Sequence, residues 1–213
     1  YLNVAAILDA AARTGADAVH PGYGFLAENA DFAKSCADAG LTFIGPSPQA
    51  IELMGNKRLA KLRMEEAEVP CVPGYSGADQ DADVLAAAGE KIGFPLMVKA
   101  ASGGGGRGMR LVAEAADLPA AISGARSEAE NAFGSGELIL EKAVIEPRHV
   151  EIQVFADSKG NCVHLGELDC SIQRRHQKVV EEAPSPAVDE DLRAAMGAAA
   201  VAAAQAIDYQ GAG

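Results

Sequence analysis

Hydrophobic residues recur at helical spacing in several stretches of the chain. At its start, Leu2, Ile7 and Leu8 fall on one face of a predicted helix over residues 1–14, and Gly15 follows as its stop. Capping residues, glycine stops and alanine-rich composition predict further helices in the same way. They cover residues 31–39, 47–54, 56–68, 83–92, 116–130 and 190–206.

Apolar and polar residues alternate in other stretches, which predicts strands. The clearest case is 148–157, where His149 and Glu151 share one face and aliphatic side chains the other. Before residue 46, predicted strands alternate with predicted helices, which indicates half of an open parallel sheet. Prolines and glycines at 70–78 indicate a linker. The remaining predicted strands cover residues 17–20, 41–45, 95–100, 109–112, 137–144 and 162–170.

Composition narrows the class of protein. The 213 residues are 49% hydrophobic and 23% charged, which suits one large or two small globular domains. A net charge of −12 argues against nucleic acid and anionic membrane as partners. We expect reduced cysteines and a cytoplasmic protein, or one of the mitochondrial matrix in a eukaryote. The opening Tyr1 and the closing letters QGAG lead us to expect a piece of a longer polypeptide.

Four consecutive glycines, Gly103 to Gly106, follow a predicted strand that ends near Lys99. The spacing fits G-x-G-x-x-G, but the next segment is β-like rather than helical, so a dinucleotide-binding turn is excluded. A glycine-rich flap between two strands instead offers backbone N–H groups to phosphates, with Lys99 as a point charge. A plain flexible hairpin is the alternative.

A second basic segment is CSIQRRHQKVVEE, which places Arg174, His176 and Lys178 close together in an acidic chain. It predicts either an anion site or a solvated charged turn, and Glu181 or Glu182 could pair with Arg174. The histidines and cysteines show no metal-ligand spacing, so no residue is assigned to a metal.

These segments together resemble the biotin carboxylase component of biotin-dependent carboxylases. The resemblance is carried by HPGYGFLAEN, FIGPSPQAIELMGNK, VKAASGGGGRGMR, EPRHVEIQVFAD and DCSIQRRHQKVVEEAPSP, in the family's order. It implies an α/β and α+β chain: an ATP-grasp fold after a Rossmann-like half-domain, incomplete at both ends. The implied divisions are an N-terminal domain part (1–46), a helical linker (47–74), a lid subdomain (75–143) and the start of the C-terminal subdomain (144–213).

The resemblance also implies the reaction. ATP would phosphorylate bicarbonate to carboxyphosphate, and the carbon dioxide released would carboxylate biotin on a carrier domain. ATP, Mg²⁺, bicarbonate and biotin are thus the implied cofactors and substrates. The implied partners are the biotin carboxyl carrier domain and a carboxyltransferase subunit, in an enzyme expected to be a homodimer that acts as an acyl-CoA carboxylase.

Residue roles follow from the same resemblance. Lys57 and Lys99 are expected at the ATP phosphates, and Gly103, Gly104, Gly105 and Gly106 in the lid. Glu141 and Lys142 correspond to the hinge at adenine, His149 and Gln173 to nucleotide contacts, and Tyr23 to the lining of the biotin site. The catalytic group is expected to comprise Lys178, His176 and Arg174.

The family continues past the end of this chain into segments that carry its magnesium-binding glutamates. We therefore expect the 213 residues alone to be inactive. Two alternatives remain open: a different ATP-grasp ligase, and a non-catalytic nucleotide-binding fragment.

Overall fold

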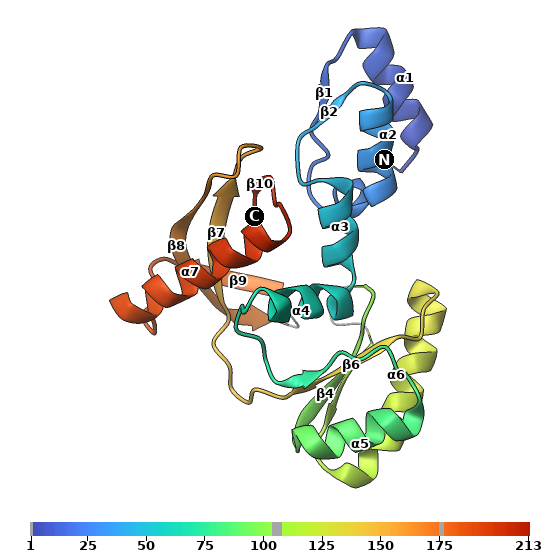
Figure 1. Ribbon diagram of the computed structural model, residues 1–213, viewed down its shortest axis with the longest axis vertical. Helices are drawn as coiled ribbons and strands as arrows, with labels where there is room; N and C mark the ends of the chain where they lie inside the picture. The colour runs from blue at the N-terminus through green and yellow to red at the C-terminus, as the bar shows by residue number, and fades with distance from the viewer. Residues whose placement is uncertain (1, 104–107, 175–176) are drawn as a thin grey trace. The chain divides into compact units, whose positions relative to one another are not determined.

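The computed structural model describes residues 2–103, 108–174 and 177–213 (Figure 1). Contacts divide the chain into two compact units. The first comprises Tyr1–Gly55, Ile152–Glu167 and Asp189–Gly213, and the second Asn56–Glu151 and Leu168–Val188. Among the described residues, no helix combines the length and apolar character that crossing a membrane needs.

The first segment of unit 1 alternates helices with two short strands. Its strands pair in parallel, with Ala18 opposite Thr42 and Val19 opposite Phe43, which confirms the predicted parallel pair. Both strands are shorter than predicted because they pair only over those two positions. The elements are α1 (Val4–Thr14), β1 (Ala18–Val19), η1 (Phe25–Glu28), α2 (Ala30–Asp38), β2 (Thr42–Phe43) and α3 (Pro48–Gly55).

A small core holds this segment together. Phe32 and Cys36 of α2 are almost fully buried, and the Phe32 ring meets Phe43 edge to face with the centroids 5.9 Å apart. The helix begins at Asn29, whose side chain accepts a hydrogen bond from the Phe32 amide at 2.7 Å. The cap and the buried ring together orient α2 against the strand pair.

Unit 2 is built on an antiparallel sheet of order β3-β6-β4-β5. The glycine run lies in the connection between β4 and β5, as the sequence predicted. The elements are α4 (Lys57–Glu66), β3 (Gly74–Tyr75), α5 (Ala82–Ile92), β4 (Leu96–Ala100), β5 (Met109–Val112), η2 (Ala115–Asp117), α6 (Leu118–Phe133) and β6 (Leu138–Lys142).

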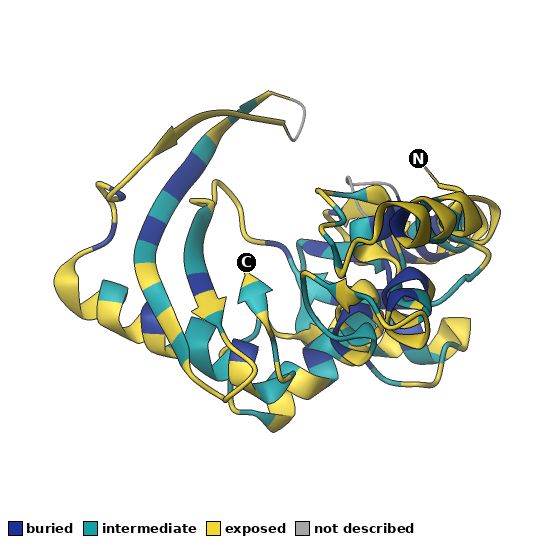
Figure 2. Cartoon of the chain, turned by 90° about the horizontal axis from the view of Figure 1, so that it is seen from above, coloured by how far each residue is buried: buried dark blue, intermediate teal, exposed yellow. Residues whose placement is uncertain are grey.

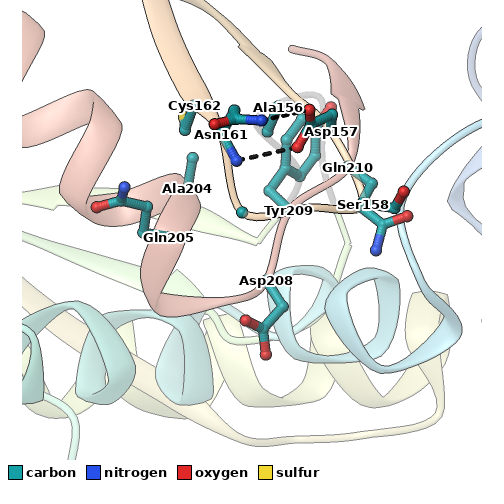
Figure 3. Close-up of a pocket in the computed structure, with 11 residues that line it drawn as sticks. Ala156, Asp157, Ser158, Asn161, Cys162, Ala204, Gln205, Asp208, Tyr209 and Gln210 are labelled. Atoms are coloured by element: carbon teal, nitrogen blue, oxygen red, sulfur yellow. Dashed lines mark hydrogen bonds between the residues drawn. The ribbon is translucent and has the colours of Figure 1, made fainter.

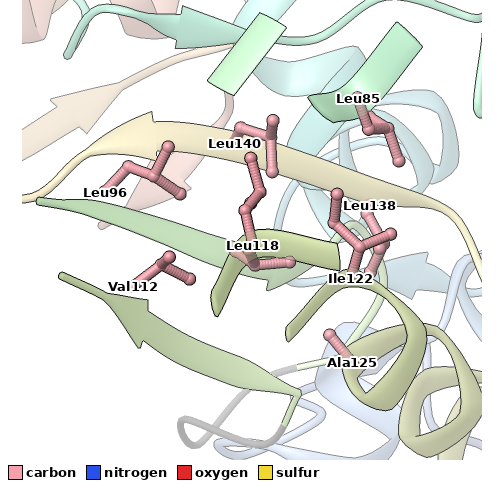
Figure 4. Packing of buried hydrophobic residues seen from close by; sticks show 9 residues of the cluster. Leu85, Leu96, Val112, Leu118, Ile122, Ala125, Leu138 and Leu140 are labelled. Carbon is pink, nitrogen blue, oxygen red and sulfur yellow. The ribbon is translucent and has the colours of Figure 1, made fainter. Parts of the chain in front are cut away.

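The helices α5 and α6 pack on one face of this sheet. Figure 4 shows Leu118 and Ile122 of α6 facing Leu96, Leu138 and Leu140 of the strands, and all of them are buried. Burying each such side chain stabilises the fold by about 1.5–3 kcal/mol. The opposite face of β4 and β6 carries Lys99 and Glu141, because side chains alternate along a strand. The core therefore fixes where the charged residues point.

A second sheet has the order β10-β7-β8-β9. Its strands are β7 (Val150–Ala156), β8 (Cys162–Arg174), β9 (Gln177–Glu182) and β10 (Gly211–Ala212). Helix α7 (Glu190–Ala206) contacts β8, where Arg193 pairs with Glu167 and the His164 ring lies against Gly197. Strand β9 was not predicted from the sequence. It is exposed along its whole length (Figure 2), so its pairing with β8 rather than burial makes it a strand.

The predicted domain boundaries after residues 46, 74 and 143 stay predictions. The two units are defined by which residues contact one another, and this does not test where the domains of a family begin and end. The four cysteines are free, as expected. Cys36 and Cys170 are buried, and Cys71 and Cys162 are half-buried.

Candidate functional site

The start of α4 is tied to the strand end that precedes the glycine run. Asn56 caps α4 through its side-chain oxygen and forms an isolated bridge with Ser102. The Lys57 amide donates to the Ala101 carbonyl at 2.8 Å, and its ammonium group donates to the carbonyl of Gly103. Lys57 therefore lies at the first residue of the glycine run, and its expected contact with the ATP phosphates stays a prediction.

Lys99 belongs to a group of three lysines, two of which share one carboxylate. Its Nζ lies 2.5 Å from Oε2 of Glu141, and Nζ of Lys61 lies 2.9 Å from Oε1. Lys61 is buried and also donates to the Val72 carbonyl at 2.5 Å. Lys57 is close enough to Lys99 that the two repel one another. The group carries three positive charges and one negative charge.

The pKa values in this lysine group reflect the crowding. Burial lowers the pKa of Lys57, and the neighbouring charge of Lys99 lowers it further. Burial acts to raise the pKa of Glu141, but hydrogen bonds from Lys99 and Lys61 outweigh it and hold that pKa below its ordinary value. The carboxylate is thus ionised and engaged twice, and an added anion would relieve the remaining repulsion.

Gly103 opens the glycine run with a backbone that suits only glycine. Its φ is +84°, and a Cβ placed there would lie 2.2 Å from Cζ of Phe133. The predicted lid residues Gly104, Gly105 and Gly106 lie outside the described residues. At the other end of the run, the Gly108 amide donates to Glu128 at 3.1 Å.

A second polar group lies where β7 and β8 run side by side. Nδ1 of His149 is 2.6 Å from the Gln173 side-chain nitrogen, and Nε2 is 3.3 Å from Oε1 of Glu151. Nζ of Lys178 lies 2.6 Å from Glu151, and that hydrogen bond raises the pKa of Lys178. The structure therefore brings together three predicted residues, His149, Gln173 and Lys178, around a carboxylate that was not assigned a role.

The rest of the basic segment differs from the expectation. Strand pairing places Gln177 opposite Arg174 and Glu182 opposite Asp169. Within the described part of the chain, no ion pair joins Arg174 to Glu181 or Glu182, so the expected pairing was wrong. The register separates these groups along the strand. His176 lies outside the described residues.

Asp169 was missed by the sequence reasoning, although it anchors the same hairpin. Its carboxylate accepts hydrogen bonds from Ser171, from the Ser185 hydroxyl at 2.9 Å and from Arg148 at 3.2 Å. The bonds from Ser171, aided by those from Ser185 and Arg148, hold the pKa of Asp169 far below its usual range. A usable signal was present, because alternation along β8 places Asp169 on the buried face with Glu167.

Two predicted residues lie in different surroundings. Lys142 ends β6, and its ammonium group donates to the Phe94 carbonyl at 2.8 Å. Tyr23 lies in the turn after β1, is 92% exposed and meets the His20 ring at a centroid distance of 6.2 Å. This exposure leaves the Tyr23 ring open to contact with a ligand, and its expected place in the lining of the biotin site stays a prediction.

A pocket in unit 1 does not fit an anion. It lies between the β7–β8 turn and the end of α7, and has a volume of about 290 Å³ (Figure 3). Asp157 and Asn161 are hydrogen-bonded to one another at its rim, and Asp208 and Tyr209 also line it. No lysine, arginine or histidine is among its described lining residues, so a phosphate would find no counter-charge there.

Comparison with known proteins places this geometry in context. Residues 56–213 match the family described as carbamoyl-phosphate synthase L chain, ATP binding domain, and residues 1–51 match biotin carboxylase, N-terminal domain. Over its whole length, the chain is 54% identical to methylcrotonoyl-CoA carboxylase subunit alpha, mitochondrial, of Dictyostelium discoideum, and it covers 30% of that protein. It is also 53% identical over its whole length to a biotin carboxylase of Halalkalibacterium halodurans, of which it covers 47%.

Solved structures give the same result. One match is a biotin carboxylase of Campylobacter jejuni, described as a beta-gamma-ATP complex, with a TM-score of 0.95 and 50% sequence identity. The match covers the whole of this chain and 48% of the Campylobacter chain. The biotin carboxylase domain of a Hydrogenobacter thermophilus 2-oxoglutarate carboxylase, with MgADP, ADP and bicarbonate, matches with a TM-score of 0.93 and 48% identity over 47% of its length. The chain spans about half the length, or less, of these relatives.

Proposed function

Because this chain belongs to the family of biotin carboxylase N-terminal and ATP-binding domains, we propose that it supplies the ATP-binding part of a biotin carboxylase. The reaction is the ATP-dependent carboxylation of biotin with bicarbonate, through carboxyphosphate. The family resemblance and the ATP-grasp fold expected from the sequence are confirmed by the matches. A different ATP-grasp ligase is not favoured, since the relatives include a biotin carboxylase and a methylcrotonoyl-CoA carboxylase subunit alpha.

The observation that carries the proposal is the excess of positive charge at the entrance to the glycine run. Lys61 and Lys99 share the carboxylate of Glu141, and Lys57 lies near enough to feel the charge of Lys99, in a chain whose net charge is −12. A local excess of cations within an acidic protein favours a multiply charged anion. A triphosphate under the glycine run meets both the ammonium groups and the backbone N–H donors.

The family resemblance, together with this placement, supports the following residue roles. Lys57 and Lys99 contact the phosphates, and the glycine run closes over them. Glu141 is a positioning residue, because its side chain is already bound by two lysines and leaves adenine recognition to the main chain near Lys142. The remaining roles are nucleotide contacts for His149, Gln173 and His176, a bicarbonate contact for Lys178, an anion contact for Arg174 and a biotin contact for Tyr23.

The chemistry is a transfer of the γ-phosphoryl group. A bicarbonate oxygen forms a bond to the γ-phosphorus while the bond to the β-phosphate bridging oxygen breaks, which leaves ADP and carboxyphosphate. Negative charge builds on the phosphoryl oxygens, and preorganised ammonium groups such as Lys99 stabilise it without reorganising. Lys178 provides the same stabilisation for bicarbonate, because Glu151 keeps it protonated.

Magnesium is implied by the family, but the described residues do not fit it. The grouped donors found among them are the imidazole of His149, the carboxylate of Glu151 and the thiol of Cys170. Mg²⁺ requires oxygen ligands in octahedral geometry. We therefore derive no step through magnesium.

Partners and location belong to the same proposal. A named relative is a subunit alpha of a carboxylase, and a solved neighbour is described as a domain dimer. We infer a biotin carboxyl carrier domain and a carboxyltransferase as partners, and a homodimer. The setting is the cytoplasm or the mitochondrial matrix, and the Dictyostelium relative is named as mitochondrial.

The test is ADP release with ATP, Mg²⁺, bicarbonate and free biotin, on the chain alone and joined to the segments that flank it in its gene. Turnover that requires both bicarbonate and biotin supports the proposal. Lys99→Met should weaken ATP binding about 10–100-fold, as expected for the loss of a charged hydrogen bond. The matched control is Lys34→Met, which removes an exposed lysine paired with Asp38. ATP binding without any turnover in the longer polypeptide would instead favour a non-catalytic nucleotide-binding module.

A further inference from the structure

Strand pairing brings three metal-ligating side chains together that are far apart in the sequence. His149 directly precedes β7 and Glu151 lies in it, two positions apart and therefore on the same side. The Cys170 amide on β8 donates to the His149 carbonyl at 2.8 Å, which places the thiol beside them. One ligand atom of each of the three residues lies within 4.8 Å of the others.

The donor set identifies the class of ion. Nitrogen, carboxylate oxygen and sulfur together suit Zn²⁺ and similar soft divalent cations, and they do not suit Mg²⁺ or Ca²⁺. The 3.3 Å between Nε2 of His149 and Oε1 of Glu151 is near the edge of a tetrahedron whose bonds are about 2.1 Å long, which is about 3.4 Å. Cys170 is fully buried whereas half of the His149 side chain is exposed, so an ion can enter from the His149 side.

We propose that His149, Glu151 and Cys170 form a binding site for a soft divalent cation such as Zn²⁺, and that the ion displaces Lys178 from Glu151. Lys178 is the present counter-ion, at 2.6 Å, and its side chain is 37% exposed, so it can turn into solvent. Linear spacing gave no sign of this site because its ligands come from two strands.

The exchange balances in charge and atoms. Before binding, Glu151 carries one negative charge, Lys178 one positive charge, and Cys170 is a thiol that donates to the His149 carbonyl at 3.4 Å. Binding adds the cation, releases the thiol proton to water and moves the ammonium group into solvent. The site then holds two positive and two negative charges, with no uncompensated charge left beside the buried sulfur.

Gln173 is the positioning residue of this site. Its side-chain amide lies 2.6 Å from Nδ1 of His149. The same amide nitrogen donates to the Cys170 carbonyl at 2.9 Å. A ligating Nε2 requires the proton on Nδ1, so the amide exchanges that bond for one in which its oxygen accepts from Nδ1. Gln173 thereby holds the imidazole ring in the orientation that ligation needs.

The experiment is a titration of the protein with Co²⁺ as the spectroscopic probe, followed by displacement with Zn²⁺, without nucleotide. We expect a charge-transfer band from one cobalt–thiolate bond per chain. Cys170→Ser should abolish the band and weaken binding at least tenfold, whereas Cys162→Ser, which removes a half-buried cysteine of the same chain, should leave both unchanged. Because no ATP is present, the outcome is independent of the proposed function.

Two further variants keep the test decisive if Cys170→Ser fails to fold. Glu151→Gln should keep the thiolate band but require at least tenfold more Co²⁺. Lys178→Met should tighten binding several-fold, because it removes the competing cation, whereas an adventitious surface site would be indifferent to it. Absence of the band from the unmodified protein, its persistence in Cys170→Ser, or unchanged affinity in Lys178→Met would each overturn the proposal.

Discussion

Lys99 and Glu141 face one another across neighbouring strands, two residues out of direct register, with Nζ 2.5 Å from Oε2. In the β4–β6 pairing Met97, not Lys99, lies opposite Glu141. The contact is therefore a diagonal one, which long side chains can span. The same carboxylate also binds Lys61 from α4. Glu141 thus holds a lysine of strand β4 and a lysine of helix α4 together.

Glu141→Gln should lower the free energy of unfolding by about 3 kcal/mol, because it leaves the buried ammonium group of Lys61 without its counter-charge. Urea denaturation at pH 7 measures the change. The matched control is Glu128→Gln, whose exposed pair with Arg110 should contribute less than about 1 kcal/mol. Equal effects of the two substitutions would contradict the assigned role of Glu141.

Gly105→Val should raise the KM for ATP and lower kcat, with little change in unfolding free energy. A β-branched side chain blocks the approach of the backbone to phosphate and disfavours positive φ. Steady-state kinetics in the polypeptide with its natural flanks measure both constants. Gly55→Ala, at a helical position with open space around it, is the control and should behave like the unmodified protein. Unchanged ATP kinetics in Gly105→Val would remove the lid hypothesis.

Lys178→Ala should cost about 2–4 kcal/mol of transition-state stabilisation, as for the loss of one preorganised electrostatic donor. This corresponds to a loss of roughly 30- to 1000-fold in kcat/KM for bicarbonate-dependent ATP hydrolysis. Lys159→Ala, in the β7–β8 turn, is the control and should leave the rate unchanged. Near-normal bicarbonate-dependent hydrolysis by Lys178→Ala would refute the assignment.

Asp169 makes acid stability testable. Its pKa is lowered in the fold, so its contribution is fully present above its ordinary pKa of 3.8 and is lost as the pH falls toward the lower folded value. Asp169→Asn should lower Tm at neutral pH and flatten the fall of Tm with pH below 3.8, since the variant has no carboxylate to protonate. Scanning calorimetry between pH 2 and 7 measures this. A parallel downward shift of Tm at every pH would contradict the ionic role.

Much of the architecture can be read from local patterns. Caps at Asn29 and Asn56 and the stop at Gly15 act within one helical turn, so they can be recognised without knowledge of the rest of the fold. In β7, apolar and polar side chains alternate along the sequence, so the strand can be recognised without knowing its neighbours in the sheet. The glycine run and its position after a strand are equally local, and they sufficed to predict a phosphate-binding flap.

The sequence by itself determined which residues form helices, which strands flank the glycine run and which family the chain resembles. Only the tertiary structure decided which side chains meet: Lys61 with Glu141, Asp169 with Ser185, and Cys170 with His149. Partners of this kind depend on strand register and on helix packing, which are set by contacts between distant segments. Strand β9 shows the same limit, because its six exposed residues, QKVVEE, show no alternation of apolar and polar side chains, and its pairing with β8 makes it a strand.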